Sequence, residues 1–194
     1  KHYRWDGYKY KDGVPLPDQL KALAPRVKEL AAFNKEIGMC AMYHTHSGAG
    51  RVGASQWDLW MLLKDHDKRA VSFNFDIAHA TIEGGLGGWL HSAKLAMPHT
   101  GGIALKDFKW GKGGNGKWRV EWQPIGDGMV QTVEYLKMAR EGGFKGPVQI
   151  HYEYDMGGAD KGATKITWSK VQVMAAMKKD LEALRGAAKS AGWA

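Results

Sequence analysis

The chain has 194 residues, of which 44% are hydrophobic and 25% charged, enough for one substantial core of a soluble globular protein. No apolar run approaches the roughly 20 residues that a membrane-spanning helix needs, so we expect no membrane partner and a cytoplasmic or periplasmic location. Cys40 is the only cysteine, which excludes an intrachain disulfide and a cysteine-rich zinc module. The net charge of +8 is spread along the chain without a dense basic stripe, so we do not expect nucleic-acid binding.

The N-terminal half of the chain alternates short apolar runs with stretches of helical periodicity. A short strand could form at His2–Trp5, and a turn-rich loop follows it. Apolar residues at helical spacing predict a helix over residues 19–35, which Gly38 ends. A strand at residues 39–44 follows, and a glycine-rich loop then leads to a helix at residues 55–64.

The second half of the chain repeats this pattern. Predicted strands at residues 70–76, 101–107 and 146–153 are each followed by a loop and a helix, at about residues 89–97, 130–141 and 169–186. The loop after the second of these strands is a long insertion rich in Gly, Lys and Trp. Helices that alternate with continuously apolar strands indicate an α/β fold, in which helices cover a parallel sheet.

Each of the four apolar strands ends in titratable residues. Ligands bind at the carboxyl ends of parallel strands, and the active site of a (β/α)₈ barrel lies there. The residues that gather at this end are His44, His46, Asp76, His79, Lys106, Asp107, His151 and Glu153. This recurrence is the strongest functional signal in the sequence.

These residue types favour a metal site. Asp76 and Glu153 supply oxygen donors, and His44, His46 and His79 supply nitrogen donors. A mixed set of this kind suits Mn²⁺, Mg²⁺, Co²⁺ or Zn²⁺ if the strands converge. In the alternative interpretation, the two carboxylates cap neighbouring helices or pair with Lys and Arg.

The other polar residues at the strand ends are open to two interpretations each. Lys106 could polarise a substrate oxygen or hold an anionic group, or it could pair with Asp76 or Asp107 and only orient the site. His151 could line the site or be a core histidine whose ring is satisfied. Trp110 lies in the insertion, where an indole could pack on the apolar face of a sugar ring or be buried by its own loop.

Several segments carry a family resemblance. The segments "FDIAHATIEGG", "IALKDFKWGK", "WQPIGDGMV" and "GPVQIHYEY" follow one another as in the xylose isomerase-like TIM barrels, the sugar phosphate isomerase/epimerase superfamily. The segment "YHTHSGAGRVGASQWDLW" resembles the His-x-His variant of the segment that precedes them. The resemblance covers about residues 31–158.

The resemblance implies a (β/α)₈ barrel with one divalent metal, often Mn²⁺. It implies an enzyme that isomerises, epimerises or dehydrates sugars or polyols by moving a proton next to a carbonyl. Asp76 and Glu153 would be metal ligands, with His44 or His46 contributing.

The leading hypothesis for the mechanism assigns catalytic roles at the strand ends. Glu153 or His44 would be the base, and His79 and Lys106 would stabilise the developing enediolate. The candidate substrate-binding residues are His46, Trp110, Asp107 and His151.

Two positions depart from the family pattern. The family's first metal glutamate falls near His44 and its metal histidine falls on Ala104. A neutral imidazole can act as a base near pH 7, so His44 could replace the carboxylate.

The resemblance covers about strands 4–8 of such a barrel, and closing eight units takes about 250 residues. We therefore expect a single partial-barrel domain over residues 1–194. It would be a fragment, a homo-oligomer, or one of two chains that complete the barrel together.

Two other functions stay open. The departures at His44 and Ala104 favour a non-catalytic sugar-binding protein or a subunit of a split barrel. A phosphodiesterase like the related apurinic endonucleases would need a richer His, Asp and Glu set than this chain has.

Overall fold

The computed structural model describes residues 1–5 and 7–193. The chain divides into two compact units. The first unit comprises Lys1–Ala104 and Gly142–Val148, and the second comprises Leu105–Glu141 and Gln149–Ala194. That residues 1–194 form a single domain stays a prediction.

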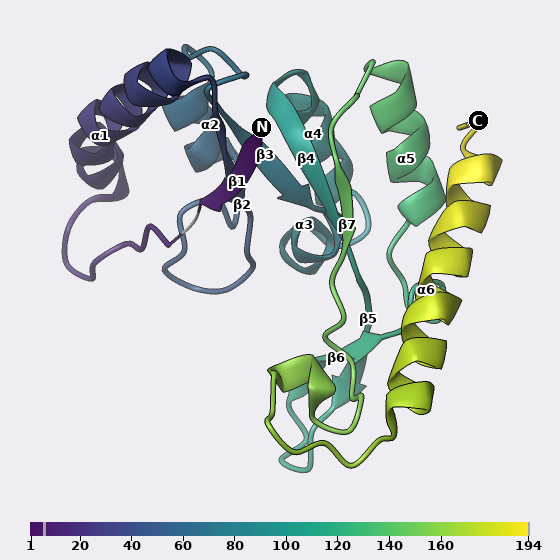
Figure 1. The fold of residues 1–194 in the computed structure, drawn as a ribbon. Helices are drawn as coiled ribbons and strands as arrows, with labels where there is room; N and C mark the ends of the chain where they lie inside the picture. Colours follow the sequence, from purple (N-terminus) through teal and green to yellow (C-terminus); the bar gives the residue numbers. More distant parts are fainter. Residues whose placement is uncertain (6, 194) are drawn as a thin grey trace. The chain divides into compact units, whose positions relative to one another are not determined.

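The central element is a five-stranded sheet of order β1-β2-β3-β4-β7 (Figure 1). Its strands are His2–Trp5 (β1), Cys40–His44 (β2), Val71–Asp76 (β3), Thr100–Leu105 (β4) and Val148–Ile150 (β7). β1, β2, β3 and β4 pair in parallel, with His44 opposite Asn74 and Asp76 opposite Ala104. The predicted α/β fold is confirmed, and the ends of the predicted strands lie within three residues of the observed ones.

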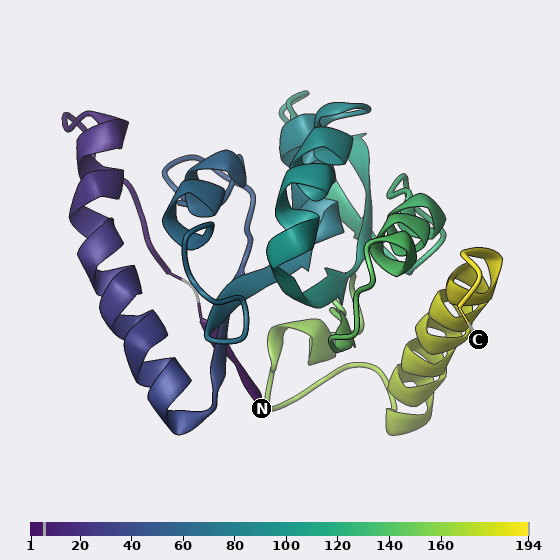
Figure 2. The ribbon, with the colours of Figure 1, turned by 90° about the horizontal axis from the view of Figure 1, so that it is seen from above.

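Four α-helices belong to the first unit: Leu16–Ile37 (α1), Trp57–Leu63 (α2), Ile77–Gly84 (α3) and Gly88–Ala96 (α4). α1 buries Val27, Ala31 and Asn34, a spacing of three to four residues that places them on one face. α1 and α2 lie on the same side of β1 and β2 (Figure 2). Gly38 ends α1 with a left-handed φ of 65°, as the sequence predicts.

The start of α3 differs from the prediction. The sequence favours a glycine-rich loop after Asp76, whereas α3 begins at the next residue. The Oδ1 oxygen of Asp76 accepts the backbone N–H of His79 at 3.1 Å, which caps the helix and allows it to start at once. The glycines lie instead where α3 ends and α4 begins, and a Cβ on Gly84, the last residue of α3, would lie 2.3 Å from the Trp89 nitrogen.

Glycine also permits the approach of β7 to β4. A Cβ on Gly146 would lie 1.9 Å from the carbonyl oxygen of Gly101, so no larger residue fits there. Beside this contact the N–H of Ile103 donates to the Pro147 carbonyl at 3.0 Å. In the second unit the N–H of His151 donates to the Leu105 carbonyl at 2.8 Å, which continues the pairing.

The insertion forms an antiparallel hairpin of Asp107–Lys112 (β5) and Trp118–Gln123 (β6), which the sequence analysis did not predict. Its turn is closed by the N–H of Gly113, which donates to the Lys117 carbonyl at 2.9 Å. Gly116 takes a φ of 73° in this turn, a conformation that favours glycine.

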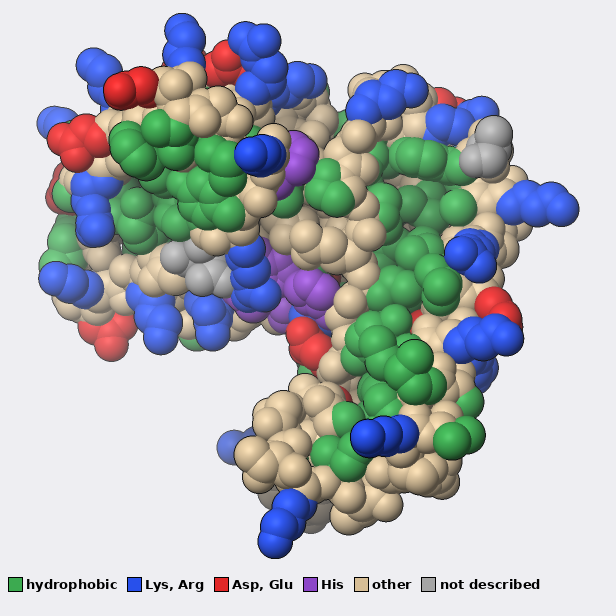
Figure 3. Space-filling view, in the orientation of Figure 1, with side chains coloured by type: hydrophobic (Ala, Val, Ile, Leu, Met, Phe, Trp, Pro, Cys, Tyr) green, Lys and Arg blue, Asp and Glu red, His purple; other side chains and the backbone are tan. Residues whose placement is uncertain are grey.

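Helices Thr132–Glu141 (α5) and Lys170–Ser190 (α6) complete the second unit, and the short 3₁₀ helices are Met97–His99 and Ala159–Lys161. Hydrophobic side chains lie along α6 (Figure 3), and Val171 and Met174 are 77% and 63% exposed. Among the described residues, no helix combines the length and apolarity that crossing a bilayer requires.

Candidate functional site

The carboxyl ends of β2 and β3 are tied to each other. The N–H of Thr45 donates to the Asn74 carbonyl at 3.2 Å, and the N–H of Asp76 donates to the Thr45 hydroxyl at 3.0 Å. These bonds fix His44 and Asp76, the last residues of the two strands, and both are completely buried. The sheet therefore brings together residues that are 32 positions apart in the sequence.

The two carboxylate oxygens of Asp76 have different roles. Oδ1 caps α3 through the His79 N–H. Oδ2 lies 3.6 Å from Nε2 of His44 and 3.9 Å from Nε2 of His79. One oxygen of Asp76 thus caps a helix, as the alternative interpretation predicted, and the other oxygen faces the imidazoles, as a metal site would require.

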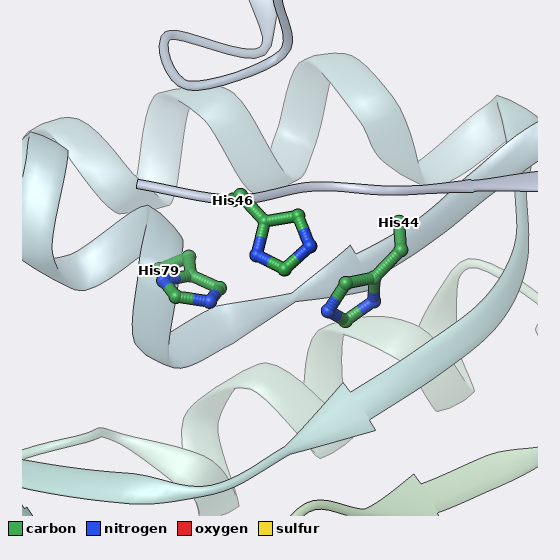
Figure 4. A group of neighbouring side chains, drawn as sticks. All are labelled: His44, His46 and His79. Atoms are coloured by element: carbon green, nitrogen blue, oxygen red, sulfur yellow. The ribbon is translucent and has the colours of Figure 1, made fainter. Parts of the chain in front are cut away.

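The rings of His44, His46 and His79 lie near one another (Figure 4). The ring centroid of His46 lies 4.6 Å from that of His44 and 5.0 Å from that of His79. The centroids of His44 and His79 lie 6.3 Å apart. One ring nitrogen of each residue lies within 4.8 Å of the other two. The group could hold a metal ion, and all three residues were predicted for the site.

Each ring also contacts a polar side chain. Ser47 Oγ lies 2.8 Å from Nδ1 of His79, and Asn74 Nδ2 lies 3.3 Å from Nδ1 of His44. The guanidinium of Arg4 lies 3.1 Å from Nε2 of His46. Contacts of this kind orient histidine rings.

These three partners were not predicted from the sequence. Only Ser47 carried a local signal, because it follows directly on the His-x-His segment. Arg4 and Asn74 reach the rings from β1 and β3, and a contact between strands has no signature in a single sequence.

The second unit holds an ion pair between two other predicted site residues. Nζ of Lys106 lies 2.5 Å from Oε1 of Glu153 and 4.6 Å from the centroid of the Trp122 ring. Lys106 is 2% exposed. Glu153 therefore pairs with a lysine, as the alternative interpretation proposed, and this pairing with Lys106 is not one that the sequence predicted.

Asp107 is buried and accepts four backbone N–H groups. Two come from Gly126 and Gly128 at 3.0 and 3.2 Å. The others come from Val130 at 3.0 Å and from Phe108 at 2.8 Å. The carboxylate holds the loop between β6 and α5, and its contact with substrate stays a prediction.

Trp110 and His151 also belong to the second unit. Trp110 on β5 is 41% exposed, and its ring meets the buried Phe108 ring edge-on at 5.6 Å. His151 is half-buried directly after β7. Sugar contacts by these two residues stay predictions.

A family model described as a xylose isomerase-like TIM barrel matches residues 2–186. The chain belongs to the xylose isomerase-like TIM barrel family. The family that the sequence motifs predict is thereby confirmed. No curated protein sequence matches the chain.

Solved structures of this fold resemble the chain at low identity. A xylose isomerase domain protein from Planctomyces limnophilus is 21% identical, with a TM-score of 0.70 over 98% of this chain and 61% of that one. A D-tagatose 3-epimerase-like protein is 17% identical, with a TM-score of 0.66 over 96% and 64%. The IOLI protein with a bound zinc atom is 13% identical, with a TM-score of 0.71 over 96% and 63%. The chain spans less than two thirds of each of these xylose isomerase-like structures.

Proposed function

We propose that this member of the xylose isomerase-like family is a sugar or polyol isomerase, epimerase or lyase that moves a proton next to a carbonyl. One observation carries the proposal: a buried carboxylate, Asp76, faces the imidazoles of His44 and His79 where two parallel strands end. The similarity to a D-tagatose 3-epimerase-like protein supports the sugar class of substrate.

The donor atoms in the first unit fit a divalent metal. The ring nitrogens within 4.8 Å of one another and the nearby Oδ2 of Asp76 are of the types that bind Mn²⁺, Mg²⁺, Co²⁺ and Zn²⁺. A bound metal would polarise the oxygens of the substrate. We propose that the metal is held in the first unit, by donors that include His44, His46 and Asp76.

We assign proton abstraction to Glu153. Its side chain is 36% exposed, so a substrate can reach it, and the buried Lys106 fixes the position of one of its oxygens. A positioned carboxylate acting as general base contributes about 10²–10⁴-fold to a rate. Lys106 would orient this base and donate a hydrogen bond to the enediolate oxygen, and His44 is the alternative base.

The test is exchange of the proton next to the carbonyl. The full chain with added Mn²⁺, Co²⁺ or Zn²⁺ is incubated in D₂O with ketopentoses, ketohexoses and their phosphates, and deuterium uptake is followed by NMR. We expect uptake with one class of sugar and a loss of about 100-fold or more in Glu153→Gln. Metal-loaded protein that exchanges no sugar proton would contradict the proposal.

A second candidate is a subunit of a split barrel or a non-catalytic sugar-binding protein. The exposed apolar residues Val171 and Met174 on α6 favour it, because a further chain could cover them. A second copy or another chain of this family would then supply further β/α units. Analytical ultracentrifugation gives the mass of the assembly, and sugar binding without deuterium uptake would identify the binding protein.

A further inference from the structure

We infer that His79 is a metal ligand and that the first unit alone carries a metal centre of three imidazoles and one carboxylate. The donors are His44, His46, His79 and Asp76, without Glu153. The inference rests on the metal use proposed above, but it concerns binding and not turnover.

The distances between donors are close to those of a metal centre. Ligand nitrogens around tetrahedral Zn²⁺ lie about 3.3 Å from one another, given bond lengths of about 2.0–2.1 Å. Oδ2 of Asp76 already lies 3.6 Å from Nε2 of His44 and 3.9 Å from Nε2 of His79. The three ring nitrogens lie within 4.8 Å of one another. Ring rotations that move each nitrogen by about 1 Å would bring them to the separations of a metal centre.

The surroundings orient the His79 ring for this role. Ser47 Oγ lies 2.8 Å from Nδ1, and a hydroxyl oxygen can accept the proton of that nitrogen. Nε2 then carries the lone pair of the ring and lies 3.9 Å from Oδ2 of Asp76, the other proposed donor. Because the backbone N–H of His79 donates to Oδ1 of Asp76, His79 and the Asp76 carboxylate are held in the same helical turn.

The same reasoning constrains the His44 ring. Binding a metal through Nε2 places the proton on Nδ1, which must then find an acceptor. Asn74 presents its Nδ2 to this atom at 3.3 Å, and a half-turn of the amide presents the oxygen instead. Metal binding at His44 therefore fixes the orientation of the Asn74 amide.

Arg4 competes with the metal for His46. A guanidinium only donates hydrogen bonds, so its contact at 3.1 Å uses the lone pair on Nε2 and leaves the proton of the neutral ring on Nδ1. Neither nitrogen of His46 can then bind a metal until this contact breaks. Removing the guanidinium should consequently raise metal affinity.

The donor set predicts which metal is preferred. Three imidazoles and one carboxylate suit Zn²⁺ and Co²⁺, whereas Mg²⁺ prefers oxygen ligands throughout. The centre should bind one equivalent of Zn²⁺ or Co²⁺ per chain more tightly than Mn²⁺ and far more tightly than Mg²⁺.

The test measures metal binding by the full chain after chelator treatment. Zn²⁺ affinity is obtained by competition with a chromophoric chelator, and the visible absorption of bound Co²⁺ reports nitrogen ligation. We expect His79→Ala and His79→Gln to weaken Zn²⁺ by more than about 100-fold, and Ser47→Ala by about 10–100-fold. Arg4→Ala should bind Zn²⁺ more tightly than the unmodified chain.

Two further variants make the test selective. Glu153→Gln and His91→Ala, which alters an exposed histidine of α4, should both keep the affinity and spectrum of the unmodified chain. The inference is overturned if both His79 variants retain Zn²⁺ affinity, or if Glu153→Gln loses it. A chain that shows the expected metal binding but exchanges no sugar proton would refute the proposed function and leave the inference intact.

Discussion

The ammonium group of Lys106 and the carboxylate of Glu153 meet at 2.5 Å, and their burial is unequal. Lys106 is 2% exposed, whereas the side chain of Glu153 is 36% exposed. The ring of Trp122 lies against the same ammonium. The pair therefore consists of a buried cation and a carboxylate that water can reach.

The two halves of this pair should contribute unequally to stability. Glu153→Gln leaves a charged ammonium without its carboxylate and should lower the free energy of unfolding by about 2–3 kcal/mol. Lys106→Met removes the buried charge and keeps the length of the side chain, so its cost should be about 1 kcal/mol or less. Urea unfolding of both variants measures the difference, and an equal or reversed order would contradict this account of the pair.

Asp107 should be important for the loop that follows β6. In Asp107→Asn an amide NH₂ group replaces one carboxylate oxygen and faces backbone N–H groups that need an acceptor. We expect a loss of about 2 kcal/mol or more in urea unfolding. The control is Asp127→Asn, which removes an exposed ion pair with Lys179 and should cost clearly less than Asp107→Asn.

His99 should make stability depend on pH. Burial lowers the pKa of its ring below the ordinary value of 6.5, although a hydrogen bond to the Val71 carbonyl opposes this shift. Below about pH 6.5 the unfolded chain therefore binds more protons at this residue than the folded chain. This contribution to stability is present above pH 6.5 and is lost as the pH falls toward the lowered pKa.

Comparing the unmodified chain with His99→Asn tests this dependence. Between about pH 7.5 and pH 5, a range that brackets the ordinary pKa, the free energy of unfolding should fall less in the variant than in the unmodified chain. His91→Asn, at an exposed histidine, should behave as the unmodified chain does. Identical pH profiles for all three proteins would show that His99 does not couple folding to pH.

Glycine at position 146 should be required for the approach of β7 to β4. In Gly146→Ala the added methyl group would collide with the carbonyl of Gly101, and the backbone must shift to relieve the contact. We expect a cost of about 3 kcal/mol or more in thermal or urea unfolding. Gly114→Ala, where no atom lies within 4 Å of the new methyl group, should change stability by less than about 0.5 kcal/mol.

The sheet and the meeting of His44 with Asp76 could be predicted from the sequence because both depend on local patterns. Apolar runs bounded by turn residues identified the strands, and the rule for parallel sheets then placed their polar ends at one edge. For this reason His44 and Asp76, far apart in the sequence, were expected to meet, and they do.

What the sequence did not predict depends on contacts that are not local. Asp107 receives hydrogen bonds from residues 126–130, so its structural role is visible only once the loop is placed. The hairpin β5–β6 was hidden by a composition typical of loops. The immediate start of α3 depends on one side-chain cap, which outweighs the glycines that follow.

Because Asp76 both caps α3 and faces the imidazoles, the site stays formed only while the first turn of α3 is intact. If that turn frays, the amide hydrogen of His79 exchanges with solvent, and the carboxylate that held it can rotate away from the imidazoles. Local opening and loss of the site would then be a single event, whose free energy the exchange rate of this amide reports. A ligand bound to these side chains should slow amide exchange at the start of α3 more than in any other helix.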